Sequence, residues 1–261
     1  MPLTETASVD GKITATTDAV IPLPDDGLYR GDGVFEVIRL YGGRPYALTD
    51  HLDRIERSAA KIELEFDRAS VERELGPLLE QNGDGDGQLR IVLTRGGRRI
   101  LLTENVPERT ASITMAKVEY SPTVILDRVK SLSYAANMQA GRIAKAAGAD
   151  DALFVLFDGT VLEAPTSSIF WAHRHGHVKT PSLELPILDS ITRDRLIGEL
   201  DVEEGIFDLD DLHHAKEAYL ASTVREVQAI SSIDGHQLEV DGPHTLEAKK
   251  AFAAVLEREL S

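Results

Sequence analysis

The sequence predicts an α/β (α+β) protein of two small domains, the first covering residues 1–119 and the second residues 120–261. Short apolar runs rich in β-branched residues alternate with segments of helical periodicity, and this alternation occurs twice along the chain. Tyr120-Ser121-Pro122 separates the two series, because proline disfavours a regular element at this point. With 261 residues, of which 42% are hydrophobic and 28% charged, the chain is long enough to bury substantial cores.

The first domain is predicted to contain three strands and two helices. The helix after Gly42-Gly43 is expected to be capped by Asp50, and its apolar residues recur at helical spacing up to Ile62. Residues 81–88, which are rich in Gly and Asp, are expected to form a loop. The expected strands are Val34–Leu40, Leu89–Thr94 and Ala111–Lys117, and the second helix lies near Ser70–Leu79.

The second domain is predicted to begin with a strand from Val124 to Lys130. The Asp158-Gly159 pair is a strong hairpin signal between two apolar runs, and Gly176 marks a second hairpin. The other expected strands are Ala152–Phe157, Thr160–Glu163, Ser168–His173, His177–Thr180 and Ala218–Ser222. The expected helices are Met138–Ala147, one beginning at Thr192, Leu209–His213 and His244–Leu260.

Composition excludes several classes of function. The absence of cysteine excludes disulfides, thiolate nucleophiles and Cys-ligated metals. A net charge of −16 argues against nucleic acid or an anionic membrane as the main partner, and it fits either an ordinary solvated surface or a salt-adapted protein. No apolar run reaches the length of a membrane span, and the N-terminus lacks the pattern of a secretory signal. The expected location is the cytoplasm.

Lys130 is the candidate catalytic residue. At the end of an apolar strand its ammonium group would be partly desolvated, which lowers the pKa of an amine and frees it to attack carbonyl groups. The alternative is a lysine whose stem packs on the strand while its charge reaches water.

Three further places are suited to an anion. The helix beginning at Asp189-Ser190-Ile191-Thr192 offers free backbone N–H groups and a hydroxyl. Ala221-Ser222-Thr223 follows a strand and offers the same groups, and Arg54 offers a planar fork for phosphate. Each has an ordinary structural explanation, since capped helices and surface ion pairs are common. Glu163 ends a hairpin strand, where a buried carboxylate needs a partner.

Together these segments resemble the class IV aminotransferases, which are pyridoxal-phosphate (PLP) enzymes of fold type IV. The resemblance runs from about Asp26 to Asp234, with eight segments in one collinear order. They are 31–39 (GDGVFEVIR), 51–54 (HLDR), 130–132 (KSL), 148–152 (GADDA), 158–163 (DGTVLE), 179–181 (KTP), 191–193 (ITR) and 222–223 (ST).

The resemblance implies a role for each matched residue. Lys130 matches the Schiff-base lysine, which also moves the proton at the substrate Cα. Glu163 matches the carboxylate that faces the pyridine nitrogen and keeps it protonated. Tyr134 matches the tyrosine that bonds the cofactor 3-hydroxyl, although it also fits a plain core aromatic. The phosphate cup is implied for Arg54, Ile191, Thr192, Ser222 and Thr223.

The chain departs from the family at three points. Ser168 stands where Asn is frequent, Ala164-Pro165 replaces a Gly-Thr pair, and Ser190 replaces the Gly before Ile-Thr. None of these changes removes a charged group, so they affect geometry and leave the PLP assignment intact.

The strand sequence Phe-Glu-Val-Ile-Arg resembles the D-amino-acid branch, which favours transfer of an amino group between a D-amino acid and a 2-keto acid. A 4-amino-4-deoxychorismate lyase, which releases pyruvate and 4-aminobenzoate, and a branched-chain L-amino-acid transaminase are the alternatives. A catalytically silent PLP-binding protein would lack a substrate site, and the histidines show no metal-ligand spacing.

The expected substrate-binding residues are Arg30, Phe35 and Arg98. We hypothesise that Arg30 and Arg98 form a carboxylate trap, with a solvated or phosphate-facing position as the equal alternative. The resemblance also implies a homodimer, with the active site between the domains and near the subunit interface.

Overall fold

The computed structural model describes residues 3–173 and 176–261, which form two compact units. The first unit comprises the chain up to Glu108 together with Val129–Tyr134, and the second comprises Arg109–Arg128 with nearly all of the chain from Ala135 on. These units divide the chain at other residues than the expected boundary between 119 and 120. The strand at 112–119 pairs within the second sheet, whereas the segment around Lys130 pairs within the first.

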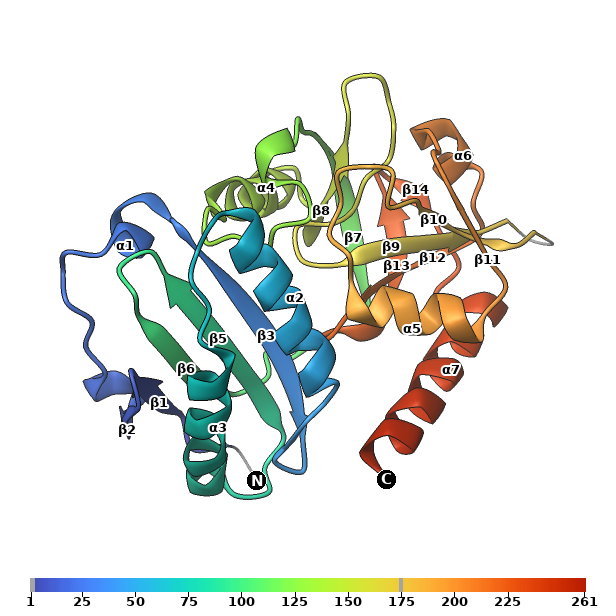
Figure 1. Ribbon diagram of the computed structural model, residues 1–261. Helices are drawn as coiled ribbons and strands as arrows, with labels where there is room; N and C mark the ends of the chain where they lie inside the picture. The colour runs from blue at the N-terminus through green and yellow to red at the C-terminus, as the bar shows by residue number, and fades with distance from the viewer. Residues whose placement is uncertain (1–2, 174–175) are drawn as a thin grey trace. The chain divides into compact units, whose positions relative to one another are not determined.

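The first unit contains one antiparallel sheet of six strands, in the order β2-β1-β6-β5-β3-β4 (Figure 1). Alternate residues of β3 face the core, because successive side chains of a strand point to opposite faces. The strands are β1 (Thr6–Val9), β2 (Lys12–Ala15), β3 (Gly33–Tyr41), β4 (Arg44–Pro45), β5 (Gly87–Thr94) and β6 (Arg99–Glu104).

Two helices cover one face of this sheet, α2 (Leu48–Lys61) over β3 and α3 (Arg68–Asn82) over β1 and β6 (Figure 1). The helix predicted to be capped by Asp50 is α2, which begins at Leu48. Its N-cap is Ala47, which has no side-chain cap, so the prediction that Asp50 caps the helix is wrong. Asp50 lies in the first turn, where its negative charge favours the helix dipole. A short helix, α1 (Asp26–Arg30), and a 3₁₀ turn, η1 (Thr16–Asp18), precede β3.

The second unit contains an eight-stranded mixed sheet, in the order β11-β10-β9-β12-β13-β7-β8, with β14 beside β13. β7 pairs in parallel with both β8 and β13, which places a strand from the middle of the chain in this sheet. The strands are β7 (Ser112–Glu119), β8 (Asp151–Val155), β9 (Ser168–Ala172), β10 (Val178–Pro181), β11 (Val202–Gly205), β12 (Glu217–Ser222), β13 (Glu226–Ile233) and β14 (His236–Gln237).

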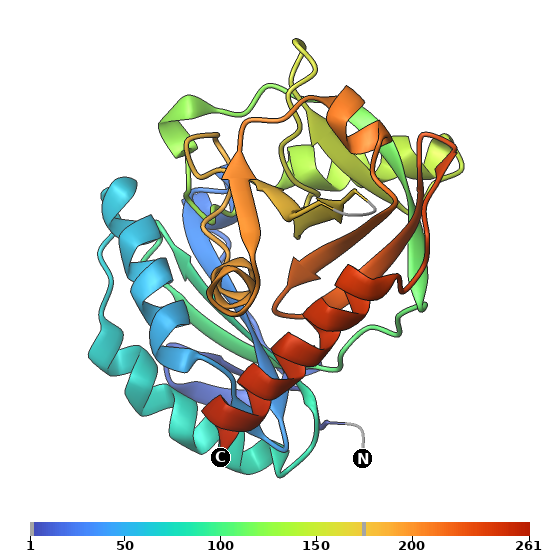
Figure 2. The ribbon, with the colours of Figure 1, turned by 90° about the vertical axis from the view of Figure 1, so that its right-hand side faces the viewer.

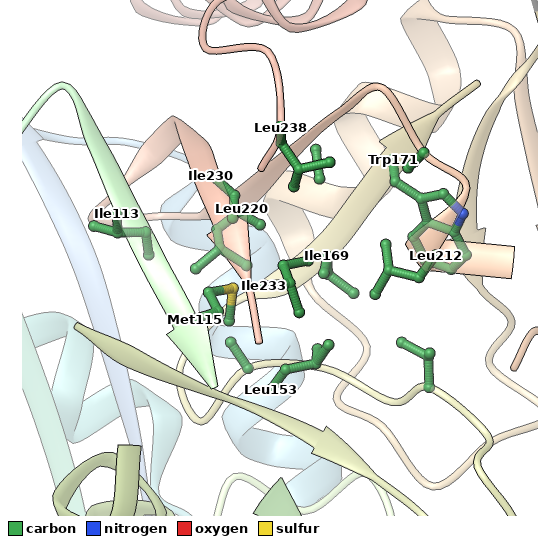
Figure 3. Close-up of a cluster of buried hydrophobic side chains, with 14 of the residues drawn as sticks. Ile113, Met115, Leu153, Ile169, Trp171, Leu212, Leu220, Ile230, Ile233 and Leu238 are labelled. Carbon is green, nitrogen blue, oxygen red and sulfur yellow. The ribbon is translucent and has the colours of Figure 1, made fainter. Parts of the chain in front are cut away.

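The main core of the second unit lies on one face of this sheet (Figure 3). Ile169 and Trp171 of β9, Leu220 of β12 and Ile230 of β13 pack there against Leu212. The remaining elements are η2 (Val124–Leu126), α4 (Ala135–Ala146), α5 (Ile191–Glu199), α6 (Leu209–His213) and α7 (Pro243–Leu260). Helices α5 and α7 lie side by side (Figure 2), and the ion pair between Arg195 and Glu259 joins them.

The predicted strand from Val124 to Lys130 is wrong. Val124–Leu126 forms the 3₁₀ turn η2, in which Val124 and Ile125 are 78% and 79% exposed, and no strand of the described residues pairs with it. Arg128 then adopts a left-handed φ of 58°. Lys130 follows in a short extended segment of the first unit. The two predicted hairpins are confirmed. The Phe154 N–H donates to the Glu163 carbonyl across the Asp158-Gly159 turn, and β9 pairs antiparallel with β10.

Candidate functional site

The backbone at Lys130 is held from two sides within the first unit. The Phe35 N–H donates to the Lys130 carbonyl (3.0 Å) and the Leu132 N–H donates to the Gly33 carbonyl (2.9 Å), so the segment extends the sheet along the start of β3. On the other side, the Lys130 N–H donates to the buried hydroxyl of Ser58 on α2 (3.3 Å). Bonds to both a strand and a helix fix the direction from which the Lys130 side chain leaves the chain.

Glycine makes this close approach possible at two positions. A Cβ on Gly33 would lie 2.3 Å from the Leu93 carbonyl oxygen and 2.6 Å from the side chain of Leu132. Gly31 has a φ of 67°, and a Cβ there would lie 3.1 Å from the Leu132 carbonyl oxygen. Gly31 is therefore required by the approach of the lysine segment, and Gly33 by the close approach of the β5 backbone and of Leu132.

The Lys130 ammonium lies over an aromatic ring. Its Nζ is 4.7 Å from the centroid of the Phe35 ring, and the Tyr134 ring meets the same ring edge-on at 5.3 Å between centroids. The structure thus brings together Lys130, Tyr134 and Phe35. Arg90 of β5 also lies over Phe35, with its guanidinium carbon 5.9 Å from the ring centroid. Sequence reasoning missed Arg90, whose position beside Phe35 depends on the register of β3 with β5.

Arg54 belongs to a buried polar network on the inner face of α2. Its Nε and Nη2 donate to the two carboxylate oxygens of Glu36 at 2.6 and 2.7 Å, and His51 Nδ1 lies 2.7 Å from the same carboxylate. Glu36 and His51 are completely buried and Arg54 nearly so. A forked guanidinium bound to both oxygens of one carboxylate has little freedom to turn, so Glu36 fixes its orientation.

The same contacts set the charge states. Burial raises the pKa of Glu36, but the charge of Arg54, together with the hydrogen bonds from Arg54 and His51, outweighs burial and holds this pKa far below its usual range. Burial lowers the pKa of His51, an effect that the Glu36 charge only partly offsets and that the charges of Arg54 and Lys130 reinforce. At neutral pH the imidazole is therefore neutral and donates its Nδ1 hydrogen to an ionised carboxylate.

Sequence reasoning missed the roles of Glu36 and His51. A usable signal existed, because residues 34, 36, 38 and 40 share the core-facing side of the predicted strand, which puts a carboxylate between Val34 and Ile38. A carboxylate in that position requires a cationic or hydrogen-bonding partner.

In the second unit, Glu163 lies beside the loop that leads into α5. Its Oε1 accepts a hydrogen bond from the Leu188 N–H (3.1 Å), and its backbone carbonyl accepts one from Phe154 of β8. Burial, and after it the negative charge of Glu163, raise the pKa of the Tyr120 hydroxyl. The carboxylate is thus anchored close to the helix start at which the predicted phosphate donors lie.

These donors belong to α5 and to the end of β12, and the two elements pack together. Ser190 caps α5 by accepting the Arg193 N–H, and Ile191 and Thr192 are buried in its first turn. The Thr192 hydroxyl is completely buried and has no hydrogen-bond partner within residues 3–173 and 176–261. Thr223 is also buried, while the Ser222 hydroxyl accepts the Arg225 N–H (3.2 Å).

The two arginines of the hypothesised carboxylate trap lie on separate segments of the first unit. Arg30 ends α1, pairs with Asp26 at 3.2 Å, and has a side chain that is 73% exposed. Arg98 lies in the turn between β5 and β6 and pairs with Asp10 at 2.7 Å. Each therefore has a carboxylate of its own chain beside it, and the trap stays a prediction.

One protein family matches the part of the chain that contains these residues. Residues 33–233, which include β3, the Lys130 segment, Glu163 and both predicted phosphate-binding segments, match the model of the family described as amino-transferase class IV. The chain belongs to the class IV aminotransferases. The structure of a fold IV transaminase from Curtobacterium pusillum is similar over 98% of this chain and 99% of its own, with a TM-score of 0.86 and 28% identity.

Relatives of this aminotransferase differ in their reactions. This chain is 30% identical over 260 residues to D-alanine aminotransferase of Bacillus licheniformis, and the alignment covers 91% of both chains. It is 29% identical over 280 residues to aminodeoxychorismate lyase of Bacillus subtilis, which covers 97% of this chain and 94% of the relative. Overall similarity therefore does not decide between an amino-group transfer and an elimination.

Class IV aminotransferases use PLP, which is the cofactor of this aminotransferase. The second unit fits an aromatic phosphate ester. The buried Thr192 hydroxyl lacks a partner among the residues that the structure describes, and the capped start of α5 presents its backbone N–H groups beside it. In the described part of the chain no helix is long and apolar enough to cross a membrane. No group of three His, Asp or Glu residues suited to a metal ion occurs in the same ranges.

Proposed function

We propose that this class IV aminotransferase transfers the amino group of a D-amino acid to a 2-keto acid, with Lys130 as the residue that binds PLP covalently. The observation that carries the proposal is the position of the Lys130 amine, 4.7 Å from the Phe35 ring on β3. That strand has the Phe-Glu-Val-Ile-Arg sequence that resembles the D-amino-acid branch, and the similarity to a D-alanine aminotransferase supports the same choice.

In this proposal PLP withdraws electrons from the substrate Cα when it is bound, and Lys130 removes and returns the Cα proton. The Lys130 amine lies over the Phe35 ring, and the Tyr134 ring meets the same ring edge-on, so these contacts hold the amine beside the start of β3. Glu163 carries the negative charge that keeps a pyridine nitrogen protonated, and its bond to the Leu188 N–H holds the carboxylate in place.

We assign the phosphate group of PLP to a set of neutral hydrogen-bond donors and to one cationic side chain. The backbone N–H groups of Ile191 and Thr192, the Thr192 hydroxyl and the Ser222-Thr223 segment supply neutral donors. Arg54 supplies the positive charge, and Glu36 determines the orientation of its guanidinium.

The substrate carboxylate requires a cation near Lys130. Arg30 and Arg98 remain candidates, but each is paired with an aspartate of its own chain. Arg90 is the better supported candidate, because its guanidinium lies over the Phe35 ring that also carries the Lys130 amine. Its partner Glu104 lies on β6, at 2.9 Å from Nε. We also propose that the protein is a cytoplasmic homodimer, as the resemblance implies.

The first test is the visible absorption of the PLP-loaded protein before and after addition of D-alanine or L-leucine. We expect D-alanine alone to bleach the band, whereas bleaching by L-leucine alone would assign the branched-chain reaction. Borohydride reduction should fix PLP to the wild type and to the control variant Lys117→Ala, but not to Lys130→Ala. Covalent attachment in Lys130→Ala would refute the assignment of the lysine.

The lyase is the second candidate, and the 29% identity to an aminodeoxychorismate lyase favours it specifically. A lyase requires no amino acceptor and releases pyruvate and 4-aminobenzoate. Production of pyruvate from aminodeoxychorismate in the absence of a keto acid, with no bleaching by D-alanine, would replace the transaminase proposal.

A further inference from the structure

Two buried serine hydroxyls of the second unit have no hydrogen-bond partner in the described part of the chain. Ser167 and Ser168 are 4% and 2% exposed, and neither Oγ atom is bonded to another described group. Leaving a buried hydroxyl unsatisfied is costly, and native proteins do so rarely. Two such groups at adjacent positions suggest that a bound molecule completes their bonds.

The Ser168 side chain points to the same side of the sheet as the α5 and α7 helices. Ser168 pairs with Ala221 of β12, and two residues on, Phe170 pairs with Tyr219 and stacks on its ring. Alternation therefore puts Ser168 on the face opposite Ile169, which belongs to the main core.

Two contacts identify this face as the one covered by α5 and α7. Glu217, which shares the Tyr219 side of β12, accepts the His244 and Thr245 N–H groups at the start of α7. Helix α5 packs against β12 and is joined to α7 by the pair between Arg195 and Glu259. The Ser168 hydroxyl is thus on the side of the sheet from which the Thr192 hydroxyl is presented.

Ser167 lies in the tight turn that directly follows Glu163. The turn is closed by the Ala164 N–H, which donates to the Ser167 carbonyl at 2.9 Å. Glu163 is in turn bonded to the Leu188 N–H, two residues before the Ser190 cap of α5. The two serines therefore lie between Glu163, which is assigned to the pyridine nitrogen, and the rest of β9. This strand pairs with β12 at Ala221, next to Ser222-Thr223.

We propose that Ser167 and Ser168 are further cofactor-binding residues, whose hydroxyls form hydrogen bonds to bound PLP. The proposal rests on the proposed function only in taking Glu163 and Thr192 as PLP-facing residues. It supplies a hydrogen-bond partner for both buried hydroxyls, which have none among the residues that the structure describes. It also gives the site polar contacts that do not depend on the charged residues.

The test uses the full-length apoprotein and two measurements that respond in opposite ways. Ser167→Ala and Ser168→Ala should each weaken PLP binding about 3- to 10-fold in a calorimetric titration, which is the effect of one net hydrogen bond. The melting temperature of each apoprotein should stay unchanged or rise, because the substitution removes an unsatisfied buried hydroxyl.

Thr180→Val is the matched control. The Thr180 hydroxyl is also completely buried, but it donates to the Ile169 carbonyl at 2.8 Å. Its loss should lower the apoprotein melting temperature and leave PLP affinity unchanged.

The inference is overturned if both serine variants bind PLP as tightly as the wild type, as they would if a buried water completed the two hydroxyls. It is also overturned if both lower the apoprotein melting temperature as Thr180→Val does, which would give the hydroxyls a structural role. These outcomes leave the proposed function intact as long as the wild type binds PLP. A wild type that binds no PLP would overturn the proposed function and this inference together.

Discussion

The substitution Glu36→Gln tests the buried network formed by Glu36, Arg54 and His51 in the first unit. It removes one negative charge and leaves the shape of the side chain almost unchanged. The carboxylate is completely buried and accepts hydrogen bonds from Arg54 at 2.6 and 2.7 Å and from His51 at 2.7 Å. A glutamine has only one acceptor oxygen, and its NH₂ group faces donors of the guanidinium or the imidazole.

The expected loss of stability is large, because the charge of Arg54 stays buried. Removing one partner of a buried ion pair costs about 3–5 kcal/mol. In a protein of this size 1 kcal/mol corresponds to about 2–4 °C in melting temperature, so the apoprotein should melt roughly 6–20 °C lower. PLP affinity should fall as well, because the guanidinium loses the group that orients it.

The assay is thermal unfolding of the apoprotein at neutral pH, followed by a PLP titration at a temperature where the variant is folded. Glu72→Gln is the matched control, because Glu72 pairs with Arg68 on the surface, with 51% of its side chain exposed. An exposed pair contributes about 0–1 kcal/mol. A Glu36→Gln apoprotein that melts within the range of this control would refute the argument that the network stabilises the first unit.

Three further predictions concern the first unit. Gly33→Ala should lower the melting temperature and prevent cofactor loading, because its Cβ would lie 2.3 Å from the Leu93 carbonyl oxygen. The control Gly76→Ala has open space around it and should be neutral or stabilising. Equal melting temperatures of the two variants would contradict this prediction. Arg90→Gln should raise KM for the 2-keto acid more than it lowers kcat, and an unchanged KM would remove Arg90 from the substrate site. Apoprotein stability should fall as the pH drops below about 6.5, since unfolded His51 takes up a proton there that the folded form, with its lowered pKa, does not. His51→Gln should flatten this slope, and an identical slope would show that other groups cause it.

Sequence reasoning succeeded where a structure is determined by neighbours in the chain. The helix expected at 209–213 has those bounds, and the Asp158-Gly159 turn joins the two runs it was predicted to join. Hydrogen bonds of turns and caps are formed within a few residues, so composition and order determine them.

It failed where a segment's structure depends on a distant partner. Val124–Leu126 has the β-branched, apolar composition of a strand, but strand formation requires a neighbouring edge, and the run forms an exposed 3₁₀ turn. Lys130 does lie in extended backbone, because the start of β3, almost a hundred residues earlier, supplies that edge. The role of Arg54 in binding phosphate stays a prediction, and the bonding of its guanidinium to Glu36 follows from the packing of α2 on β3, which no local pattern reports.

The return of Val129–Tyr134 to the first unit has a consequence for biosynthesis. A ribosome that has released only the first 108 residues has delivered all six strands of the first sheet, yet the N-terminal edge of β3 still lacks its partner. Such an edge can pair with other chains until it is covered. The nascent first unit therefore remains incomplete until the stretch through Tyr134 has emerged, by which time β7 of the other sheet is also outside. Lys130, the residue proposed to bind PLP, thus lies in the segment that completes the first sheet. The first unit therefore cannot complete its fold before Lys130 has been synthesised.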